Sequence, residues 1–287
     1  HSSWRRTEPV HVPTTEGAVP ASINIYIQQS MELPQVLELP SGIAVVLTIA
    51  RNRELKPNED AAGVARVGDD GALLVVADGM GGTRDGCAAA AAVIEHLATN
   101  VPRADDSESR MRTAILDGIE AANQHILNAI PEGGTTLAAV ELRGHTLRPY
   151  QVGDSSILVT GQRGKLKLNT VAHSPVGFAV EAGLLDEDEA MRHVHRHVIS
   201  NALGFPEMRI ELGETLELAR HDTLVILSDG VTDNLFVSDI IERVRKGSLE
   251  DAVLALASLA RTRMRTPQLE TPTKPDDLTI IAYRRSG

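Results

Sequence analysis

Acidic residues stand at the ends of several strand-like segments of this sequence. They are Asp78 after "LLVVA", Asp229 after "LVILS", Asp276 and Asp277 before "LTIIAY", and Glu59 and Asp60 in "KPNEDA". If these ends meet at one edge of a sheet, the carboxylates repel one another unless a multivalent cation neutralises them. The positions of these residues therefore raise the hypothesis of a metal site.

The candidate ligands are all oxygen atoms, which favours Mg²⁺ or Mn²⁺. Gly79, Gly81 and Gly82 surround Asp78 in "VVADGMGG". Glycine would let the carbonyl of Gly79 turn toward an ion and would leave room for water and substrate. A single Asp-Gly after a strand is more often an ordinary turn, so these residues alone leave two interpretations open, a metal site and a set of turns.

The hydrophobic pattern predicts the elements that would position these residues. Aliphatic and β-branched runs predict strands at 42–50, 72–78, 223–230 and 278–285, with three more between 133 and 170. Apolar residues at helical spacing predict helices at 86–101, 108–130, 237–247 and 249–264. The strands come in hairpins instead of alternating singly with helices, which predicts antiparallel sheets covered by helices.

Charge and cysteine content narrow the classes of function. The chain has 28 Lys and Arg against 39 Asp and Glu, a net charge of -11, and we therefore expect no nucleic-acid partner. No apolar run reaches the ~18 residues of a membrane span, so none is expected. The single cysteine, Cys87, allows no intramolecular disulfide, which is typical of the reducing cytoplasm, where we expect the protein.

Residues 1–40 differ in composition from the rest of the chain. The stretch "RRTEPVHVPTTEGAVPAS" is rich in Pro, Thr and charge and has no periodicity, and we expect an extension or linker, with a short strand at 23–28. Because the chain begins at His1 without a methionine, we expect this segment to include a cloning remnant. The folded domain is expected over residues 41–287.

Several motifs occur in an order that resembles the bacterial metal-dependent serine/threonine protein phosphatases of the protein phosphatase 2C (PP2C, or PPM) family. They are "NEDA", "VADGMGG", "GGTTLAA", "VGDSS", "AHS", "EAGLLDEDEA", "NALG", "SDGVTD" and "PDDLT". The resemblance covers roughly Ser41 to Arg284. The resemblance implies an α+β fold, a four-layer α-β-β-α sandwich in which two antiparallel sheets are flanked by helices. It also implies two Mn²⁺ or Mg²⁺ ions at one end of the sandwich.

The resemblance also implies roles for single residues at the two core ions. Asp78 resembles the carboxylate that bridges both ions, and the carbonyl of Gly79 would bind one of them. Asp229 and Asp276 resemble the other ligands of the first ion, and these three Asp residues together with Arg53 are the expected catalytic set. Two ions about 3.5–4 Å apart can share a water molecule and lower its pKa, so that it attacks phosphorus in line.

Further acidic residues resemble outer members of the same site. Asp60, together with Glu59, resembles the support of the second ion, directly or through water. Asp154 in "VGDSS" resembles a ligand of a third, weaker ion, and Asp233 resembles a neighbour of this group. Thr135 and Thr136 are expected to be packing residues in a strand.

The sequence departs from the family pattern where substrate phosphate is bound. Family members carry an Arg four residues before the Glu of the "ED" pair, and this chain has Leu55 there. Arg53 and Lys56 flank that position, and we expect Arg53 to hold the phosphate because a guanidinium binds it with two hydrogen bonds. The alternative is that both are solvated loop charges.

Other departures do not affect the expected ligands. Ser156 and Ala172 replace an Arg and an Asp of the usual motifs, and Met80 stands where eukaryotic relatives carry a His. The histidines of "RHVHRHV" lie in the segment that resembles the family's variable flap, and we expect them at the surface.

The resemblance implies a protein phosphatase, an enzyme that hydrolyses phosphoserine and phosphothreonine with a metal-activated water. Its expected partners are phosphorylated proteins, among them a Ser/Thr kinase or the targets of that kinase. The alternative is a pseudophosphatase, a binding module that keeps the fold and has lost turnover, and Leu55 favours it. A metal-dependent nuclease is disfavoured by the negative net charge.

Overall fold

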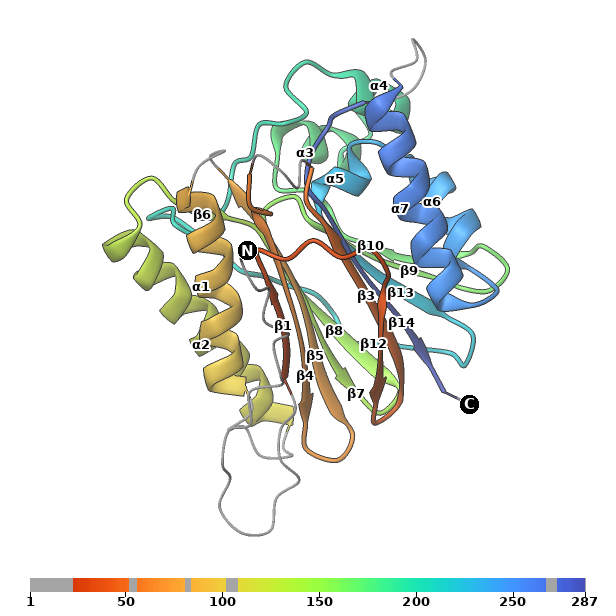
Figure 1. The fold of residues 1–287 in the computed structure, drawn as a ribbon, viewed down its shortest axis with the longest axis horizontal. Coiled ribbons are helices and arrows are strands. Elements are labelled where there is room, and N and C mark those ends of the chain that lie inside the picture. The colour runs from red at the N-terminus through yellow and green to blue at the C-terminus, as the bar shows by residue number, and fades with distance from the viewer. Residues whose placement is uncertain (1–22, 52–55, 81–83, 102–107, 267–272, 287) are drawn as a thin grey trace, which may run out of the picture.

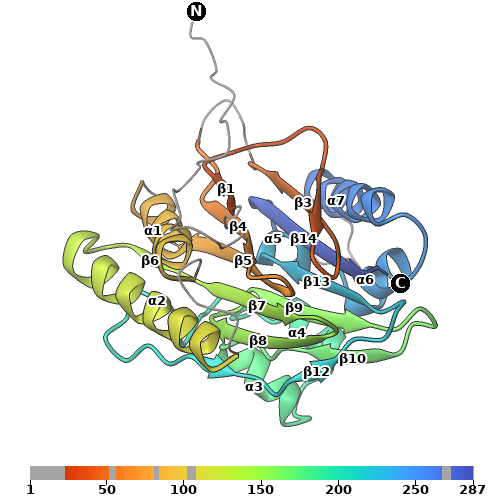
Figure 2. The same cartoon turned by 90° about the horizontal axis from the view of Figure 1, so that it is seen from below.

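Two antiparallel sheets stacked face to face form the centre of the molecule (Figures 1 and 2). The structure, a computed structural model, describes residues 23–51, 56–80, 84–101, 108–266 and 273–286. Within these residues the strands pair in two sheets, and every pair of neighbours is antiparallel. This arrangement confirms the antiparallel pairing predicted from the hairpins.

The first sheet carries Val75 to Met80 of "VVADGMGG". Its strands in spatial order are β1 (Ile23–Ile27), β4 (Asp60–Val67), β5 (Gly71–Met80), β7 (Leu137–Arg143), β8 (Thr146–Val152) and β11 (Glu211–Leu212), with β6 (Gly134–Thr135) beside β5 and β12 (Leu216–Glu217) beside β8. In the register of β4 and β5, Asp60 lies opposite Asp78. Strand pairing therefore brings two of the predicted site residues together directly.

The second sheet carries the other acidic ends. Its strands in spatial order are β10 (Leu166–Asn169), β9 (Ser156–Thr160), β13 (Thr223–Leu227), β14 (Leu278–Arg285), β3 (Gly42–Ile49) and β2 (Gln35–Leu39). Leu227, the last residue of β13, pairs with Ile280 near the start of β14. Asp229 and Asp276 therefore lie at the same end of neighbouring strands.

Helices cover the outer face of each sheet. The helices are α1 (Arg84–Asn100), α2 (Glu108–Ala129), α3 (Pro175–Glu181), α4 (Glu187–Arg192), α5 (Asp229–Thr232), α6 (Val237–Val244) and α7 (Leu249–Arg265). One buried cluster joins α1 and α2 to the first sheet, another joins α6 and α7 to the second, and a third lies between the sheets. Figure 1 shows the two helix pairs on opposite sides. The four-layer α-β-β-α sandwich is thus confirmed.

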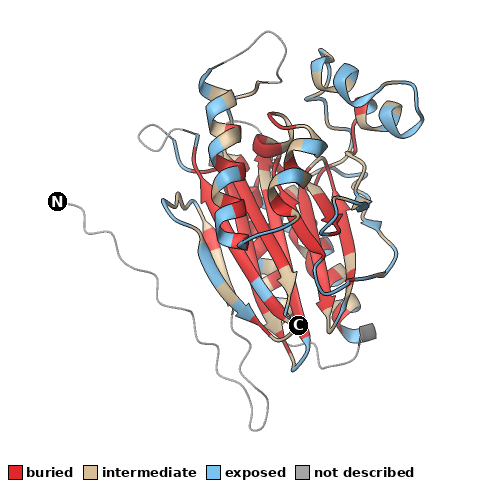
Figure 3. Cartoon of the chain, turned by 90° about the vertical axis from the view of Figure 1, so that its right-hand side faces the viewer, coloured by how far each residue is buried: buried red, intermediate tan, exposed pale blue. Residues whose placement is uncertain are grey.

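Alternation along the strands explains this layering. In β5, Leu73 and Val75 face α1 and α2, whereas Leu74 and Val76 face the second sheet. Since both faces of such a strand are buried, it reads as a continuous apolar run up to Ala77. Figure 3 shows the strands as the most buried part of the molecule. The core is therefore continuous up to the residue before Asp78.

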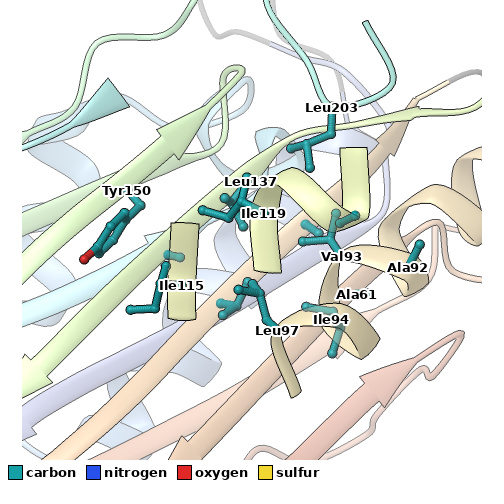
Figure 4. Close-up of a cluster of buried hydrophobic side chains, with 14 of the residues drawn as sticks. Ala61, Ala92, Val93, Ile94, Leu97, Ile115, Ile119, Leu137, Tyr150 and Leu203 are labelled. Carbon is teal, nitrogen blue, oxygen red and sulfur yellow. The ribbon is translucent and has the colours of Figure 1, made fainter. Parts of the chain in front are cut away.

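The cluster beneath α1 and α2 is built from aliphatic side chains. Ile115 and Ile119 of α2 and Leu97 of α1 point toward the sheet, close to Leu137 and Tyr150 (Figure 4). All five are at most 2% exposed. With few aromatic residues available, this packing gives the first sheet a rigid backing, and it supports the end of β5.

Two strands precede the domain boundary expected at residue 40. The strand expected at 23–28 is observed as β1, which pairs with β4, and β2 pairs with β3. We therefore propose that the sandwich domain includes the chain from Ile23 onward. Residues 1–22 lie outside the described part. Among the described residues, no helix combines the length and hydrophobicity that a membrane span needs.

Candidate active site at one end of the sandwich

A cavity of about 690 Å³ opens at the end of the sandwich where β5, β8 and β13 finish and β4 and β14 begin. Its lining includes the acidic residues Glu59, Asp78, Asp154, Asp229, Asp276 and Asp277. Gly79 lines it too. The fold thus brings together most of the acidic residues singled out from the sequence, although they come from five separate segments. Gly81, Gly82 and Arg53 lie outside the described residues.

Asp60 is buried behind this lining. It is 2% exposed and is not among the described residues that line the cavity. Its carboxylate accepts a hydrogen bond from the Ser228 hydroxyl (2.8 Å), and that hydroxyl accepts one from the N–H of Thr279 (2.9 Å). Asp60, which lies opposite Asp78 in the strand register, therefore links β4 of the first sheet to β14 and to the end of β13 in the second.

The backbone of Asp78 is held by two threonines. The Asp78 N–H donates to Thr136 Oγ1 (3.0 Å), and the Asp78 carbonyl accepts from Thr135 Oγ1 and from the Thr136 N–H (both 2.9 Å). Thr136 Oγ1 also lies 2.6 Å from Ser155 Oγ, beside Asp154. These threonines do more than pack in a strand, because they tie Asp78 to the loop of Asp154.

The loop of Asp154 is fixed from the opposite side by the "AHS" motif. His173 Nδ1 accepts a hydrogen bond from the Gly153 N–H (3.1 Å), and its Nε2 lies 2.8 Å from the Glu211 carboxylate. Gly153 has a φ of +96°, a conformation that favours glycine. The motif thus positions the backbone of the turn that carries Asp154.

Asp276 and Asp277, the two aspartates before β14, make different contacts. Both carboxylate oxygens of Asp277 accept backbone N–H groups, from Arg51 and from Glu59 (2.6 Å each). Asp276 instead faces Lys274 across 3.0 Å. Asp277 therefore fastens the segment that carries Glu59, and Asp276 keeps its carboxylate in the cavity.

Lys274 is the main site residue that the sequence analysis missed. Its ammonium group contacts the carboxylates of Asp229, Asp233 (3.1 Å) and Asp276 (3.0 Å). Burial would lower the pKa of Lys274, but these carboxylates outweigh it and hold that pKa well above its usual range. The only signal in the sequence was a basic residue two positions before Asp276.

His197 reaches the edge of the same group. It lines the cavity, and its Nδ1 lies 3.2 Å from Asp233 Oδ2. Although burial opposes the shift, hydrogen bonds from His197 and the charge of Lys274 hold the pKa of Asp233 below its usual value. The histidine segment was expected at the surface, and His197 is indeed exposed, but it also contacts the acidic cluster.

Several other carboxyl groups of the site have raised pKa values. Burial, and then repulsion from neighbouring carboxylates, raises the pKa of Asp78 well above its usual range, that of Asp229 to about 6 and that of Asp154 to about 8. The pKa of Asp60 is also raised, mainly by burial. A group of acids with raised pKa values in one cavity is typical of a functional site.

Two oxygen atoms in this group mark where a cation would fit. Asp154 Oδ1 and Asp229 Oδ1 are buried and have no hydrogen-bond partner among the described residues. An unpaired buried carboxylate oxygen is costly, and a hard divalent cation satisfies such atoms. The donor set therefore suits Mg²⁺ or Mn²⁺. In the described part of the chain, no group of three or more His, Cys, Asp or Glu side chains is arranged so that it could hold a metal ion without rearrangement.

The fold and the acidic cavity together define an α-β-β-α sandwich protein with a candidate centre for metal-assisted hydrolysis. Comparison with known proteins agrees. The chain matches the protein phosphatase 2C family over residues 50–269. A putative protein phosphatase 2C-type of Streptococcus pyogenes is 32% identical over 67% of this chain and 80% of its own length.

Solved structures show the same fold. The serine/threonine phosphatase Stp1 from Staphylococcus aureus superposes with a TM-score of 0.74 at 26% identity, covering 90% of this chain and 99% of that one. The catalytic domain of the phosphatase PstP, solved in complex with two manganese ions, has a TM-score of 0.68 at 24% identity over 85% of this chain and 98% of that one. The chain therefore belongs to the protein phosphatase 2C family and is a serine/threonine protein phosphatase.

The raised pKa values predict how stability depends on pH without metal. An Asp titrates near pH 3.9 in the unfolded chain, whereas Asp229 and Asp154 titrate near 6 and near 8 in the fold. The folded state thus binds more protons, and its stability falls as pH rises through these values. We expect the melting temperature of the metal-free protein to fall from about pH 5 to about pH 9, and saturating Mn²⁺ to suppress the decline.

An Asp154→Asn variant is the control for the upper part of this range. It removes the group with the pKa of about 8, so its melting temperature should decline less than that of the wild type above pH 7. A metal-free wild type whose melting temperature rises over the same range would contradict the electrostatic account of the cavity.

Proposed function

We propose that this phosphatase hydrolyses phosphoserine and phosphothreonine with two divalent ions, Mn²⁺ or Mg²⁺, at the acidic cavity. Asp78, the Gly79 carbonyl, Asp229 and Asp276 would hold them, with Glu59 and Asp60 as acidic support and Asp154 as a ligand of a third ion. The observation that carries the proposal is the pair of buried, unpartnered carboxylate oxygens on Asp154 and Asp229. The Mn²⁺ complex of the structurally similar PstP domain supports it.

The side chains around the cavity suit this reaction. When bound, divalent ions supply charge neutralisation and lower the pKa of a coordinated water. Hydrogen bonds with Thr135 and Thr136 fix the backbone of Asp78, and a hydrogen bond to Asp277 fixes the backbone of Glu59. Met80, Ile199 and Phe205 give part of the lining an apolar character, which limits the water that reaches the reacting phosphate.

Phosphate recognition requires a cation at the cavity. Arg51 and Lys56 both line the cavity, and Arg53 lies between them in the sequence. We assign the main contact to Arg53, as its planar guanidinium can bind two phosphate oxygens at once, whereas an ammonium acts as a point charge. Arg51 is the alternative that the structure adds.

Phosphorylated proteins are the substrates, and a Ser/Thr kinase or its targets are the partners that we propose. The similarity to bacterial serine/threonine phosphatases supports this choice. The single cysteine supports a reducing cytoplasm as the place of the reaction. The pseudophosphatase alternative rests on Leu55 alone, while six acidic residues still line the cavity.

Replacing the proposed bridging ligand tests the two-ion proposal. Asp78→Asn should lower kcat by more than about 100-fold, the upper end of the loss from an outer partner of a ligand, because an amide cannot neutralise both ions. Turnover of p-nitrophenyl phosphate and of a phosphopeptide at saturating Mn²⁺, with an EDTA blank, measures it. Asp70→Asn, at the exposed turn between β4 and β5, is the control and should keep wild-type turnover. Near-normal turnover of Asp78→Asn would refute the proposal.

Asp154 should act on a weaker ion only. Asp154→Ala should keep two ions at Asp78 and lose the third, with catalysis reduced most at low metal concentration. A crystal structure of the variant grown with Mn²⁺, together with a Mn²⁺ titration of activity, checks this. Loss of both core ions in that crystal would place Asp154 in the main site instead.

Three single alanine variants identify the phosphate contact. Arg53→Ala should reduce kcat/KM for a phosphopeptide by about 1.5–3 kcal/mol, mostly through KM, as expected for a charged hydrogen bond. Lys56→Ala should cost less. If Arg51→Ala alone shows the loss, Arg51 is the contact. If all three variants match wild type, the assignment fails and another residue holds the phosphate.

A further inference from the structure

Lys274 places a positive charge of the chain itself among the proposed metal ligands. Its ammonium contacts Asp229 and lies 3.0 Å from the Asp276 carboxylate and 3.1 Å from that of Asp233. The side chain is only 25% exposed and lines the cavity. Two of its three partners are therefore the residues to which the proposed first ion would bind.

Backbone hydrogen bonds hold Lys274 in this position. The Asn234 side chain accepts a hydrogen bond from the Lys274 N–H and donates one to the Lys274 carbonyl, both 2.8 Å long. Asn234 is fully buried and also donates to the Gly230 carbonyl (2.9 Å), next to Asp229. The backbone of Lys274 is thus fastened to α5, the helix that carries Asp229, and the ammonium is kept within reach of it.

An ammonium group and a divalent ion compete for the same two carboxylates, because Lys274 contacts Oδ2 of Asp229 and of Asp276 while the unpartnered Oδ1 of Asp229 is open to the ion. Both are positive, so they repel each other at short range, and each neutralises the same charges. In the metal-free protein the ammonium compensates Asp229 and Asp276, which otherwise face several like charges. When an ion binds these two residues the ammonium must leave them, although Asp233, which closes α5, can still hold it.

We propose that Lys274 is a tethered competitor of the divalent ion: it holds Asp229 and Asp276 in place in the metal-free protein and weakens metal binding, because the ion must displace it. The inference rests on the proposed metal centre and deepens it. By linkage, a residue that stabilises only the metal-free state lowers the affinity for the metal by the same free energy.

Lys274→Met tests the proposal, because methionine keeps much of the side-chain stem and removes the charge. Its dissociation constant for Mn²⁺, measured by calorimetry with no substrate present, should fall roughly 5- to 150-fold, the usual range of coupling between two sites. Its melting temperature without metal should fall below that of wild type, and the rise on adding Mn²⁺ should be larger. Lys274→Arg, which keeps the charge, should change the dissociation constant less.

Lys167→Met is a matched control. Lys167 is 26% exposed and pairs with the buried Asp222, at the opposite end of β13 from Asp229. This variant should lose a similar ion pair, lower the melting temperature equally with and without Mn²⁺, and leave the dissociation constant unchanged.

These measurements distinguish a failure of the proposed metal centre from a failure of the inference about Lys274. If wild type binds no Mn²⁺ in calorimetry, both the metal centre and this inference are refuted. If wild type binds Mn²⁺ and Lys274→Met binds it equally or more weakly, the metal centre stands and the competitor is refuted. An unchanged dissociation constant with a raised KM for a phosphopeptide would instead identify Lys274 as a phosphate contact.

Discussion

Repulsion between carboxylates at one end of the sandwich is the constraint on which the rest of the structure depends. Asp60 and Asp78 face each other across β4 and β5, and Asp229 lies at the end of β13 in the other sheet. Burying such groups together is unfavourable, so the surrounding fold must supply the free energy. Strands that are apolar on both faces do so, since each packs against a helix layer and against the opposite sheet.

Hydrogen bonds from uncharged side chains fix the positions of the buried carboxylates. Thr135 and Thr136 saturate the backbone of Asp78, and Ser228 joins Asp60 to β14. These hydroxyls have no charge of their own, so they constrain the carboxylates without consuming the negative charge that a cation needs. The small, β-branched or hydroxyl-bearing residues of "GGTTLAA" and "LVILSDG" thus belong to the site as much as the acids do.

Much of this arrangement could be predicted from the sequence, and the missing parts share one cause. The antiparallel sheets with covering helices and the acidic strand ends follow from local patterns, because alternation and strand termini are properties of short segments, whereas the four-layer sandwich was implied by the family resemblance. The pairing of β1 with β4 and the contact of Lys274 with Asp229 join residues far apart in the chain. The periodicity of apolar residues within a segment does not predict contacts between segments that are far apart in the chain. The sequence around "PDD" therefore gives no local indication that Lys274 contacts Asp229 of α5.

Each acidic pair divides its two carboxylates between structure and cavity. Where the chain enters a strand, successive side chains point in opposite directions. Glu59 accordingly lines the cavity while Asp60 is buried against Ser228, and Asp276 meets Lys274 while Asp277 accepts two backbone N–H groups. Asp60 lies behind the cavity lining, Asp277 lines the cavity but is committed to two backbone N–H groups, and Asp276 is already compensated by Lys274. The number of ions that the site needs therefore depends on which carboxylates remain uncompensated, and a count of the acidic residues in the motifs overstates it.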